Sequence, residues 1–432
     1  MSTELSRIAE LARQDRKRQF LSIAHLITPD ALTSAYHALR KDASPGIDRV
    51  THEEYGRKLK ENIADLHARL KEQRYSAQPL KRVYIPKEDG KQRPISIPSL
   101  EDKVAQKAAV TILETIYEQD FLPVSYGFRP GRSTHDALNE IGRVICRRRT
   151  EYVLEADICA YFDSIVRENL MALIERRVKD GSMLRLIQKW INVGVIDNGR
   201  LLVTETGTGQ GQTISPLLAN VYLHNVLDLW FEGAVKPLLR GSAELIRYCD
   251  DFVICFRYKD DAERTLDALT KRFAKYGLTL HPEKTRLIAF GRQALESWEH
   301  GGRKPDTFDF LGFSHFCARS LKGNFTIHIS TMRKRLRRAA TRISEWCRAH
   351  RHNPVADQQK ALNKKLAGHY GYYGRPTNLR ALWRFHRLVR RIWKKWLNSR
   401  TRGKTLTWAR YARILERYPL LRPRITHAWS TK

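Results

Sequence analysis

The ten residues Arg247–Phe256, RYCDDFVICF, constrain the fold of this chain more than any other segment. Two short runs rich in branched and aromatic residues, LIRYC and FVICF, flank a pair of aspartates and predict two strands. Two residues between strands is the length of a hairpin turn, so Asp250 and Asp251 are expected at the tip of a rigid ribbon. Adjacent carboxylates repel each other unless a cation lies between them, which makes the tip a candidate cation site. A solvated turn is the alternative for this segment alone.

A second run, YVLEADICAYFDSI at Tyr152–Ile165, makes the cation site the stronger interpretation. Here another predicted strand ends on Asp157, and Asp163 follows six residues later. Asp157 together with the two aspartates of the hairpin would form a cluster of hard oxygen ligands suited to Mg²⁺. Two ions about 3.5–4 Å apart on such carboxylates carry out in-line phosphoryl or nucleotidyl transfer.

The formal net charge of +32 is concentrated at the C-terminal end. From residue 330 to residue 432 the chain has 28 Lys and Arg against three Asp and Glu. Aromatic residues are interleaved with these cations, among them Trp346, Tyr370, Tyr372, Tyr373, Trp383, Trp393 and Trp396. Charge of one sign on this scale indicates a polyphosphate partner, and nucleic acid is favoured over a membrane surface or a merely solubilising face.

Several classes of protein are disfavoured by what the sequence lacks. No apolar run approaches 18 residues, so no transmembrane helix is expected. The N-terminal segment has no apolar signal core, which predicts a soluble intracellular protein. Six cysteines are scattered and none forms a C-x-x-C pair, which argues against structural zinc and against a disulfide framework.

Helices and strands alternate without the regular spacing of βαβ units, which favours an α+β fold over a doubly wound sheet. The segment KRVYIPKEDGKQRPISIP alternates basic and apolar residues around Asp89-Gly90 and predicts a β-hairpin. A domain boundary is expected near residues 318–330, because the pattern is helical from Ser330 onward. There, apolar residues recur every three or four positions: Met332, Leu336, Ala339, Ile343 and Trp346.

Eight segments, in this order, resemble the reverse transcriptases encoded by bacterial group II introns. They are SPGIDRVT, KRVYIPKEDGKQRPISIPS, GFRPGRSTHDAL, EADICAYFDSI, GTGQGQTISPLLANVYLH, RYCDDFVICF, GLTLHPEKTRLIAF and FDFLGF. The stretches GHYGYYGRPTNLRALWRF and RPRITH are similar to the thumb, or maturase, region of intron-encoded proteins. The resemblance extends from about Ser44 to the C-terminus.

The resemblance implies an α+β right-hand polymerase. Its fingers and palm would be built from an antiparallel sheet plus helices, followed by an α-helical thumb (maturase) domain. We expect a helical N-terminal extension at residues 1–43, fingers and palm at 44–318, the thumb at 319–400 and a basic C-terminal segment at 401–432. The scattered cysteines argue against an appended zinc-type HNH nuclease, so no endonuclease domain is expected.

The resemblance also implies an RNA-directed DNA polymerase that works by two-metal nucleotidyl transfer, with two Mg²⁺ ions or Mn²⁺ in their place. The expected partners are group II intron RNA, target DNA with its primer, and dNTPs, without zinc or a membrane. Such a protein assists splicing and moves by target-primed reverse transcription. A bacterial cytoplasmic location is expected, with association to the nucleoid when the protein acts on DNA.

The family's catalytic positions correspond to Asp157, Asp250 and Asp251 in this sequence. Asp157 and Asp250 are expected as the main metal ligands, with Asp251 a weaker one and Ile158 included among the metal-holding positions. Ions held there would activate the primer 3′-OH and neutralise charge on the triphosphate.

Five further residues match nucleotide-binding positions: Lys87, Arg93, Phe162, Gln210 and Lys284. The two cations of the predicted fingers hairpin would bind the triphosphate, which suits the bidentate contacts of Arg; exposed hairpin charges are the alternative. Phe162 would be a steric gate against the ribose 2′-OH, or a core aromatic. Gln210 lies in a glycine loop that lets backbone approach a nucleotide, or that is only a connector. Lys284 would protonate the leaving pyrophosphate, or is a solvated lysine.

Basic residues in two regions are expected to bind nucleic acid, mainly through phosphates and therefore in a salt-dependent way. They are Arg129, Arg132, Arg333, Arg337, Arg338, Arg342, Lys394 and Lys395. The aromatic residues of the C-terminal region could stack on bases, but thumb core is the favoured interpretation for each of them.

The sequence departs from the family at two places. The family loop G-x-P-Q-G-G is here Gly207–Gln212, GTGQGQ, with Gly209 in place of Pro, and the variable position before the paired aspartates is Cys249. Neither change removes a charged catalytic group, so activity is expected.

Two other functions stay open at this point. A related reverse transcriptase domesticated for defence, repair or CRISPR spacer acquisition would have the same active site. A non-catalytic RNA-binding splicing factor would keep only the fold, but the intact set of three aspartates with Lys87 and Arg93 argues against it.

Overall fold

The computed structural model describes residues 3–86, 92–197, 199–203, 206–400 and 405–428. The chain divides into two compact units, which we describe separately. The first comprises Met1–Thr134, Ala156–Ile254 and Asp260–Arg286. The second comprises His135–Glu155, Cys255–Lys259 and Leu287–Lys432. This division follows the packing of the chain rather than functional domains, so the predicted domain limits stay predictions.

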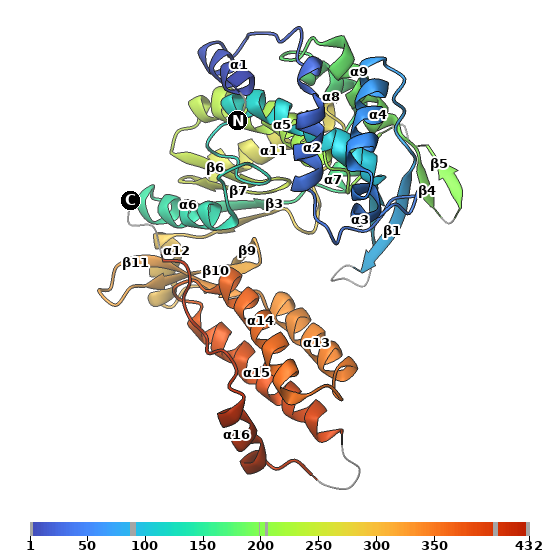
Figure 1. The fold of residues 1–432 in the computed structure, drawn as a ribbon. Coiled ribbons are helices and arrows are strands. Elements are labelled where there is room, and N and C mark those ends of the chain that lie inside the picture. The colour runs from blue at the N-terminus through green and yellow to red at the C-terminus, as the bar shows by residue number, and fades with distance from the viewer. Residues whose placement is uncertain (1–2, 87–91, 198, 204–205, 401–404, 429–432) are drawn as a thin grey trace. The chain divides into compact units, whose positions relative to one another are not determined.

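Helices and strands are mixed along the chain, as predicted (Figure 1). The α-helices are α1 (Thr3–Gln14), α2 (Pro29–Ala38), α3 (His52–Gly56), α4 (Leu59–Lys71), α5 (Leu100–Asp120), α6 (Thr134–Arg147), α7 (Tyr161–Ser164), α8 (Arg167–Ile174), α9 (Gly181–Asn192), α10 (Ser215–Leu223), α11 (Lys259–Lys275), α12 (Arg292–Glu299), α13 (Arg333–Ala349), α14 (Val355–Tyr373), α15 (Leu379–Asn398) and α16 (Trp408–Arg417). Short 3₁₀ segments are η1 (Ala24–Leu26) and η4 (Lys236–Leu238), and π-helical segments are η2 (His224–Asp228) and η3 (Phe231–Val235). The strands are β1 (Leu80–Pro86), β2 (Gln92–Ile97), β3 (Tyr152–Ala156), β4 (Val195–Asp197), β5 (Arg200–Leu202), β6 (Ala243–Tyr248), β7 (Asp251–Phe256), β8 (Arg286–Ala289), β9 (Phe308–Phe310), β10 (Phe313–Arg319) and β11 (Phe325–Thr331).

In the first unit, a sheet of order β2-β1-β4-β5 contains the hairpin predicted around Asp89-Gly90. β1 and β2 pair in antiparallel register from Lys81 opposite Ile97 to Pro86 opposite Gln92, while β1 and β4 run parallel. The hairpin is therefore confirmed, and its turn at residues 87–91 lies outside the described residues, as does Lys87.

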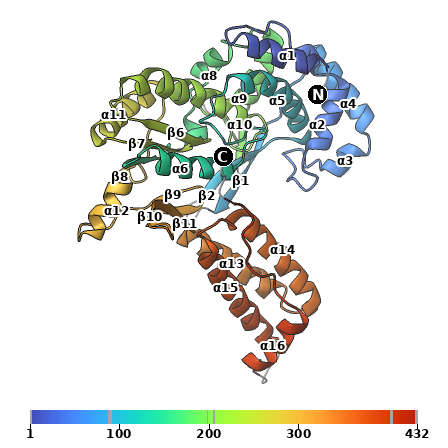
Figure 2. The ribbon, with the colours of Figure 1, turned by 90° about the vertical axis from the view of Figure 1, so that its left-hand side faces the viewer.

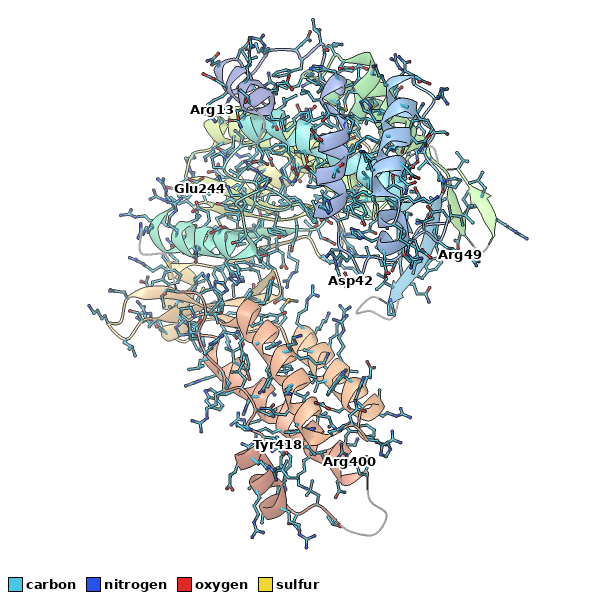
Figure 3. The ribbon with its side chains drawn as sticks, in the orientation of Figure 1. Arg13, Asp42, Arg49, Glu244, Arg400 and Tyr418 are labelled. Carbon is cyan, nitrogen blue, oxygen red and sulfur yellow. The ribbon has the colours of Figure 1, made fainter. Side chains whose placement is uncertain are left out.

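Helix α5 forms the centre of the first unit, with α1 and α2 packed against it (Figure 1). Ser99 caps its N-terminus by accepting a hydrogen bond from the Asp102 amide, which satisfies one of the unpaired amides of the first turn. Most of its residues are buried, including the polar Asp102, Lys103 and Gln106, so other parts of the unit cover the helix on most of its surface. Arg13 of α1, labelled in Figure 3, donates to Gln119 of α5 at 3.1 Å and fixes the two helices at their ends.

The sheet that carries the candidate site has the order β6-β7-β3-β8. The Glu151 amide donates to the Phe256 carbonyl at 2.9 Å, so the beginning of β3 lies beside the end of β7. The two strands therefore run antiparallel, and the end of β3 at Ala156 lies beside the start of β7 at Asp251. This topology brings together two segments about ninety residues apart in sequence, one ending on Asp157 and the other beginning at Asp250.

In the second unit, the sheet β11-β10-β9 leads into helices α13, α14 and α15, which lie side by side in Figures 1 and 2. This confirms the helical pattern predicted from residue 330. Leu362, Leu366, Val389 and Trp393 are fully buried between these helices. Arg400, labelled in Figure 3, donates to the carbonyls of residues 351 and 353 and ties the end of α15 to the α13–α14 turn.

The predicted basic C-terminal segment contributes to this core. Its helix α16 buries Tyr411, whose hydroxyl donates to the Arg390 carbonyl at 2.9 Å. Beyond α16, the amides of Thr426 and His427 donate to the carbonyl of Gly374. Among the described residues, no helix combines the length and the apolar character needed to cross a membrane.

Candidate active site

The turn between β6 and β7 consists of Cys249 and Asp250, and Asp251 is the first residue of β7. Cys249 has a φ of +60°, in the left-handed region that non-glycine residues seldom adopt. Positive φ in a two-residue turn matches the twist of the flanking strands, which explains the strained residue. The predicted hairpin is therefore confirmed, but its turn lies one residue earlier than predicted, with Asp250 in the turn and Asp251 in β7. Both aspartate side chains are half-buried.

Asp157 follows β3 directly and is held by the segment that follows α11. The Asp157 carbonyl accepts from the His281 amide, and the Cys159 amide donates to the Thr279 carbonyl, both at 2.8 Å. Ile158 forms an isolated antiparallel bridge with Leu280. The same segment brings Lys284 to the site, where its Nζ donates to Asp157 Oδ2 at 2.6 Å. Two residues predicted separately from sequence thus form an ion pair.

Asp250 lies in an environment that opposes its ionisation. Burial raises the pKa of the Asp250 carboxyl, and the negative charge of Asp157 raises this pKa further. The Arg93 guanidinium acts in the opposite direction and lowers the pKa of Asp250. The site therefore contains two carboxylates whose negative charges interact unfavourably. It also contains Arg93, a predicted triphosphate ligand whose positive charge acts on Asp250.

The donor set fits a hard divalent cation. Carboxylate oxygens are the preferred ligands of Mg²⁺, and a cation between Asp157 and Asp250 would relieve their repulsion. Ile158 is buried and apolar, so only its backbone carbonyl could serve as a ligand. Within the part of the chain that the structure describes, no three His, Cys, Asp or Glu side chains are gathered into one potential metal site.

Phe162 lies on α7, one turn after Asp157, and is half-buried. Ala160 before it has a φ of +42°, so the chain bends sharply into the helix. The Phe162 carbonyl accepts from the Thr208 amide at 3.0 Å, and the Ile165 carbonyl accepts from the Gly207 amide at 2.9 Å. The candidate steric gate is thus attached to the glycine loop at residues 207–212.

The glycine loop is also attached to β2, the strand of Arg93. The Ser96 amide donates to the Gln210 carbonyl at 2.6 Å. Gly211 has a φ of +117°, and a Cβ there would lie 2.6 Å from the Ser96 carbonyl oxygen, so only glycine fits. Gln210 is half-buried, and its main chain rather than its side chain makes this contact.

Sequence reasoning missed the buried residue of this loop, Gln212. Its side chain accepts from Gln106 Nε2 at 2.8 Å and donates to the carbonyls of Trp190 and Thr208. A Cβ at Gly209 would lie 2.7 Å from Gln212 Nε2. The buried amide therefore requires glycine at 209, whose φ of +62° also excludes proline. The available signal was Gln212 itself, a polar residue three positions after the Gly209 that replaces the family's Pro.

The loop residue Arg129 is directed inward. Its guanidinium is buried, forms a bidentate ion pair with Glu118 of α5 and donates to the carbonyls of Leu122 and Ser125. Sequence pattern alone does not distinguish such a tie from a phosphate ligand, and we leave Arg129 out of the nucleic-acid surface. Arg132 is exposed, with its guanidinium 5.3 Å from the centre of the Tyr126 ring.

The predicted nucleic-acid residues of the second unit lie on two helices. On α13, Arg333, Arg337 and Arg342 are exposed and Arg338 is half-buried. On α15, the Nζ of Lys394 lies 4.8 Å from the centre of the Trp408 ring, and that of Lys395 lies 5.2 Å from the Trp396 ring. Lys395 is exposed and Lys394 is half-buried.

Comparisons with known proteins place this chain among reverse transcriptases. The model of the reverse transcriptase (RNA-dependent DNA polymerase) family matches residues 85–315. Protein YkfC of Escherichia coli (strain K12) is 35% identical over 282 residues, which cover 57% of this chain and 74% of YkfC. The group II intron-encoded protein LtrA of Lactococcus lactis subsp. cremoris is 37% identical over 224 residues, or 51% of this chain and 37% of LtrA. The mitochondrial nuclear intron maturase 2 of Arabidopsis thaliana is 25% identical over 234 residues, or 44% of this chain and 30% of that protein.

Proposed function

Because this chain belongs to the reverse transcriptase family, we propose that it is an RNA-directed DNA polymerase of a group II intron, which also binds the intron RNA to assist splicing. The observation that carries the proposal is a pair of carboxylates, Asp157 and Asp250, at the ends of adjacent strands. The charge of Asp157 raises the pKa of Asp250, and the charge of Arg93 lowers it. The relation to an intron-encoded protein and an intron maturase supports the partner. A polymerase that also binds its intron RNA could copy that RNA from a primer in the target DNA, which is target-primed reverse transcription.

Divalent ions bound at Asp157, Asp250, Asp251 and the Ile158 carbonyl would activate the primer 3′-OH and neutralise charge on the triphosphate. The protein's own contribution is to hold the reactants in line. Arg93, which is exposed on β2, would bind triphosphate oxygens from the fingers hairpin. Lys87, outside the described residues, is proposed for the same task.

Lys284 is proposed as the group that protonates the leaving pyrophosphate. The Lys284 side chain is 61% exposed, and its Nζ lies 2.6 Å from Asp157 Oδ2, so the ammonium group is at the edge of the site rather than in the interior. A lysine ammonium group can give up a proton from Nζ when pyrophosphate leaves. Gln210 is proposed to face the nucleotide from the glycine loop.

Primer extension on an RNA template tests the proposal. With Mg²⁺ and dNTPs, the purified chain is expected to extend a DNA primer to the end of the template. Addition of EDTA should stop the reaction, and Mn²⁺ should restore it. Retained RNA binding without extension under any metal would contradict polymerase activity and favour a role in splicing alone.

Replacing Phe162 with Ala is expected to weaken discrimination against ribonucleotides. Removal of the ring opens space for the 2′-OH, so relative use of CTP against dCTP should rise about 10- to 200-fold, the range that a pocket resolves for one small group. The measurement is kcat/KM for both nucleotides. Phe316→Ala, which removes a half-buried ring on β10, is the control. Unchanged discrimination in the Phe162 variant would reject the steric gate.

The exposed arginines of α13 are expected to determine the salt dependence of RNA binding. Neutralising two phosphate contacts should reduce the slope of log K against log salt by about 1.8 for a duplex. We predict this change for the double variant R333Q/R337Q, measured by fluorescence anisotropy over a salt series. The matched control is K271Q/K275Q, which removes two exposed cations with the same spacing on α11. Equal slopes for the two variants would place the RNA elsewhere.

A further inference from the structure

A fully buried ion pair lies behind the catalytic hairpin. The Arg247 guanidinium binds Asp228 in bidentate fashion, with Nε 2.7 Å from Oδ1 and Nη2 2.6 Å from Oδ2. Both side chains are completely shielded from solvent. Burying two charges costs more free energy than the pair regains unless further hydrogen bonds satisfy them, so such a pair is weak evidence for a role in stability.

The remaining donor of Arg247 reaches the catalytic turn. Its Nη1 donates to the Cys249 carbonyl at 3.0 Å and to Asn220 Oδ1 at 3.0 Å. The Cys249 carbonyl and the Asp250 amide belong to the same planar peptide group. The hydrogen bond from Arg247 therefore fixes the plane of the peptide from which the Asp250 side chain projects. The first residue of this turn, Cys249, has a strained φ.

The backbone of Arg247 is anchored as well. Its amide donates to the Val124 carbonyl at 2.8 Å, and its carbonyl accepts from the Tyr126 amide at 2.9 Å. The next residue, Gly127, accepts a hydrogen bond from Asn220 Nδ2 at 2.7 Å. Asn220 thus joins the guanidinium to the segment beside the turn, and the contacts form a closed ring around the peptide before Asp250.

A π-helical segment sets the partners of Arg247 on one side of their helix. Asn220 lies on α10 and Asp228 ends η2, which continues it. Eight residues along a regular α-helix rotate the side chain about 80° past two full turns. A π turn contains more residues than an α turn, which reduces this excess rotation, so both side chains face Arg247. Segments of π-helix often occur at functional sites.

We propose that Arg247 is a positioning residue for catalysis: held by Asp228 and Asn220, it orients the Cys249–Asp250 peptide and thereby the carboxylate that binds the catalytic cation. The proposal rests on the proposed polymerase function. Arg is required because its planar fork serves three acceptors in fixed directions, which the point charge of Lys does not.

The experiment uses the full chain with both charges removed together. Arg247→Met alone would leave Asp228 buried without its counter-charge and is expected to unfold the protein. The double variant R247M/D228N removes this penalty at similar volume. Its matched control is R177M/D120N, a buried pair in the same unit whose Nε–Oδ2 distance is 2.8 Å and which has no contact with the turn.

For R247M/D228N we expect kcat for primer extension to fall about 10- to 100-fold, as for other residues that orient metal ligands. The Mg²⁺ midpoint, which is the Mg²⁺ concentration that gives half-maximal activity, should rise. KM for dNTP, RNA affinity and the circular dichroism spectrum should match those of the control. Arg247→Lys should recover folding without recovering kcat. Mn²⁺ binding measured by electron paramagnetic resonance without substrates should weaken about 10-fold in the double variant only.

The outcomes separate the two hypotheses. If the wild type does not extend primers, the polymerase function is wrong, and the Mn²⁺ measurement still decides whether Arg247 orients the ligand. If the wild type is active and the folded double variant keeps its kcat, Mg²⁺ midpoint and Mn²⁺ affinity, the positioning role is overturned. An equal loss in R177M/D120N would overturn it too, since the effect would then be general destabilisation.

Discussion

Asp250→Asn should abolish primer extension while making the folded protein more stable. Asparagine keeps the shape of the side chain and removes the charge that would hold a cation. We expect kcat to fall about 10²- to 10³-fold or more, the range for losing a group that acts on the transition state. RNA binding should not change, because we expect the C-terminal cations to supply it. Extension is measured with Mg²⁺ in excess, so that weak metal binding cannot account for the loss.

The gain in stability follows from the direction of the Asp250 pKa shift. Burial and the charge of Asp157 raise this pKa, so ionisation of Asp250 costs folding free energy. A carboxyl with a raised folded pKa favours the folded state at low pH, and that stability is lost as pH rises through the folded pKa. Asparagine avoids the loss. In EDTA, the variant should therefore melt at a higher temperature than wild type at neutral pH, and the difference should vanish in acid.

A control separates this effect from the general loss of an aspartate. Asp260→Asn removes an exposed carboxylate whose partner is Arg240, and it should leave both extension and melting temperature close to wild type. If Asp250→Asn retains full activity, the assignment of the catalytic carboxylates is wrong. If it is inactive but less stable than wild type, Asp250 has a structural role that the shifted pKa does not describe.

The catalytic hairpin could be predicted from sequence because its determinants are local. Two strand-forming runs predicted the hairpin to within one residue, with the turn at Cys249-Asp250 instead of Asp250-Asp251, and helical periodicity predicted α13 in the same way. The residues that hold the turn could not be predicted, since Asp228 and Asn220 are 19 and 27 positions from Arg247. Such partners depend on how α10 packs on the sheet, which no local pattern encodes.

Side-chain direction was the second limit of the sequence. Arg129 is a residue type that often binds phosphate, yet its side chain is buried in an ion pair with Glu118 of α5. The aromatic residues of the C-terminal region also divide by packing: Trp393 is fully buried, whereas Trp383 is 40% exposed and Trp408 is 57% exposed. The buried rings form the core of the second unit, so base stacking stays a prediction for the exposed rings only.

Gly127→Ala should slow primer extension strongly, although Gly127 has no side chain that could take part in the reaction. Gly127 is buried beside the catalytic turn, and a Cβ there would lie 2.5 Å from the Cys249 nitrogen and 2.9 Å from the Tyr248 carbonyl carbon. Both neighbours are backbone atoms, so one added methyl must displace the turn. Misplacement of a reacting group by about 1 Å can cost about 10²-fold in rate, and we expect a loss of that size in kcat.

The same methyl should destabilise the fold by about 1–3 kcal/mol, the usual cost of overpacking, which leaves most molecules folded at the assay temperature. Gly233→Ala is the matched control, because Gly233 is exposed on η3 and an added Cβ there meets nothing within 4 Å. Comparing kcat, Mg²⁺ midpoint and melting temperature of the two variants separates displacement of the turn from loss of stability. A Gly127→Ala enzyme with wild-type kcat would mean that the turn tolerates displacement, and that catalysis depends on the carboxylates without depending on the backbone that presents them.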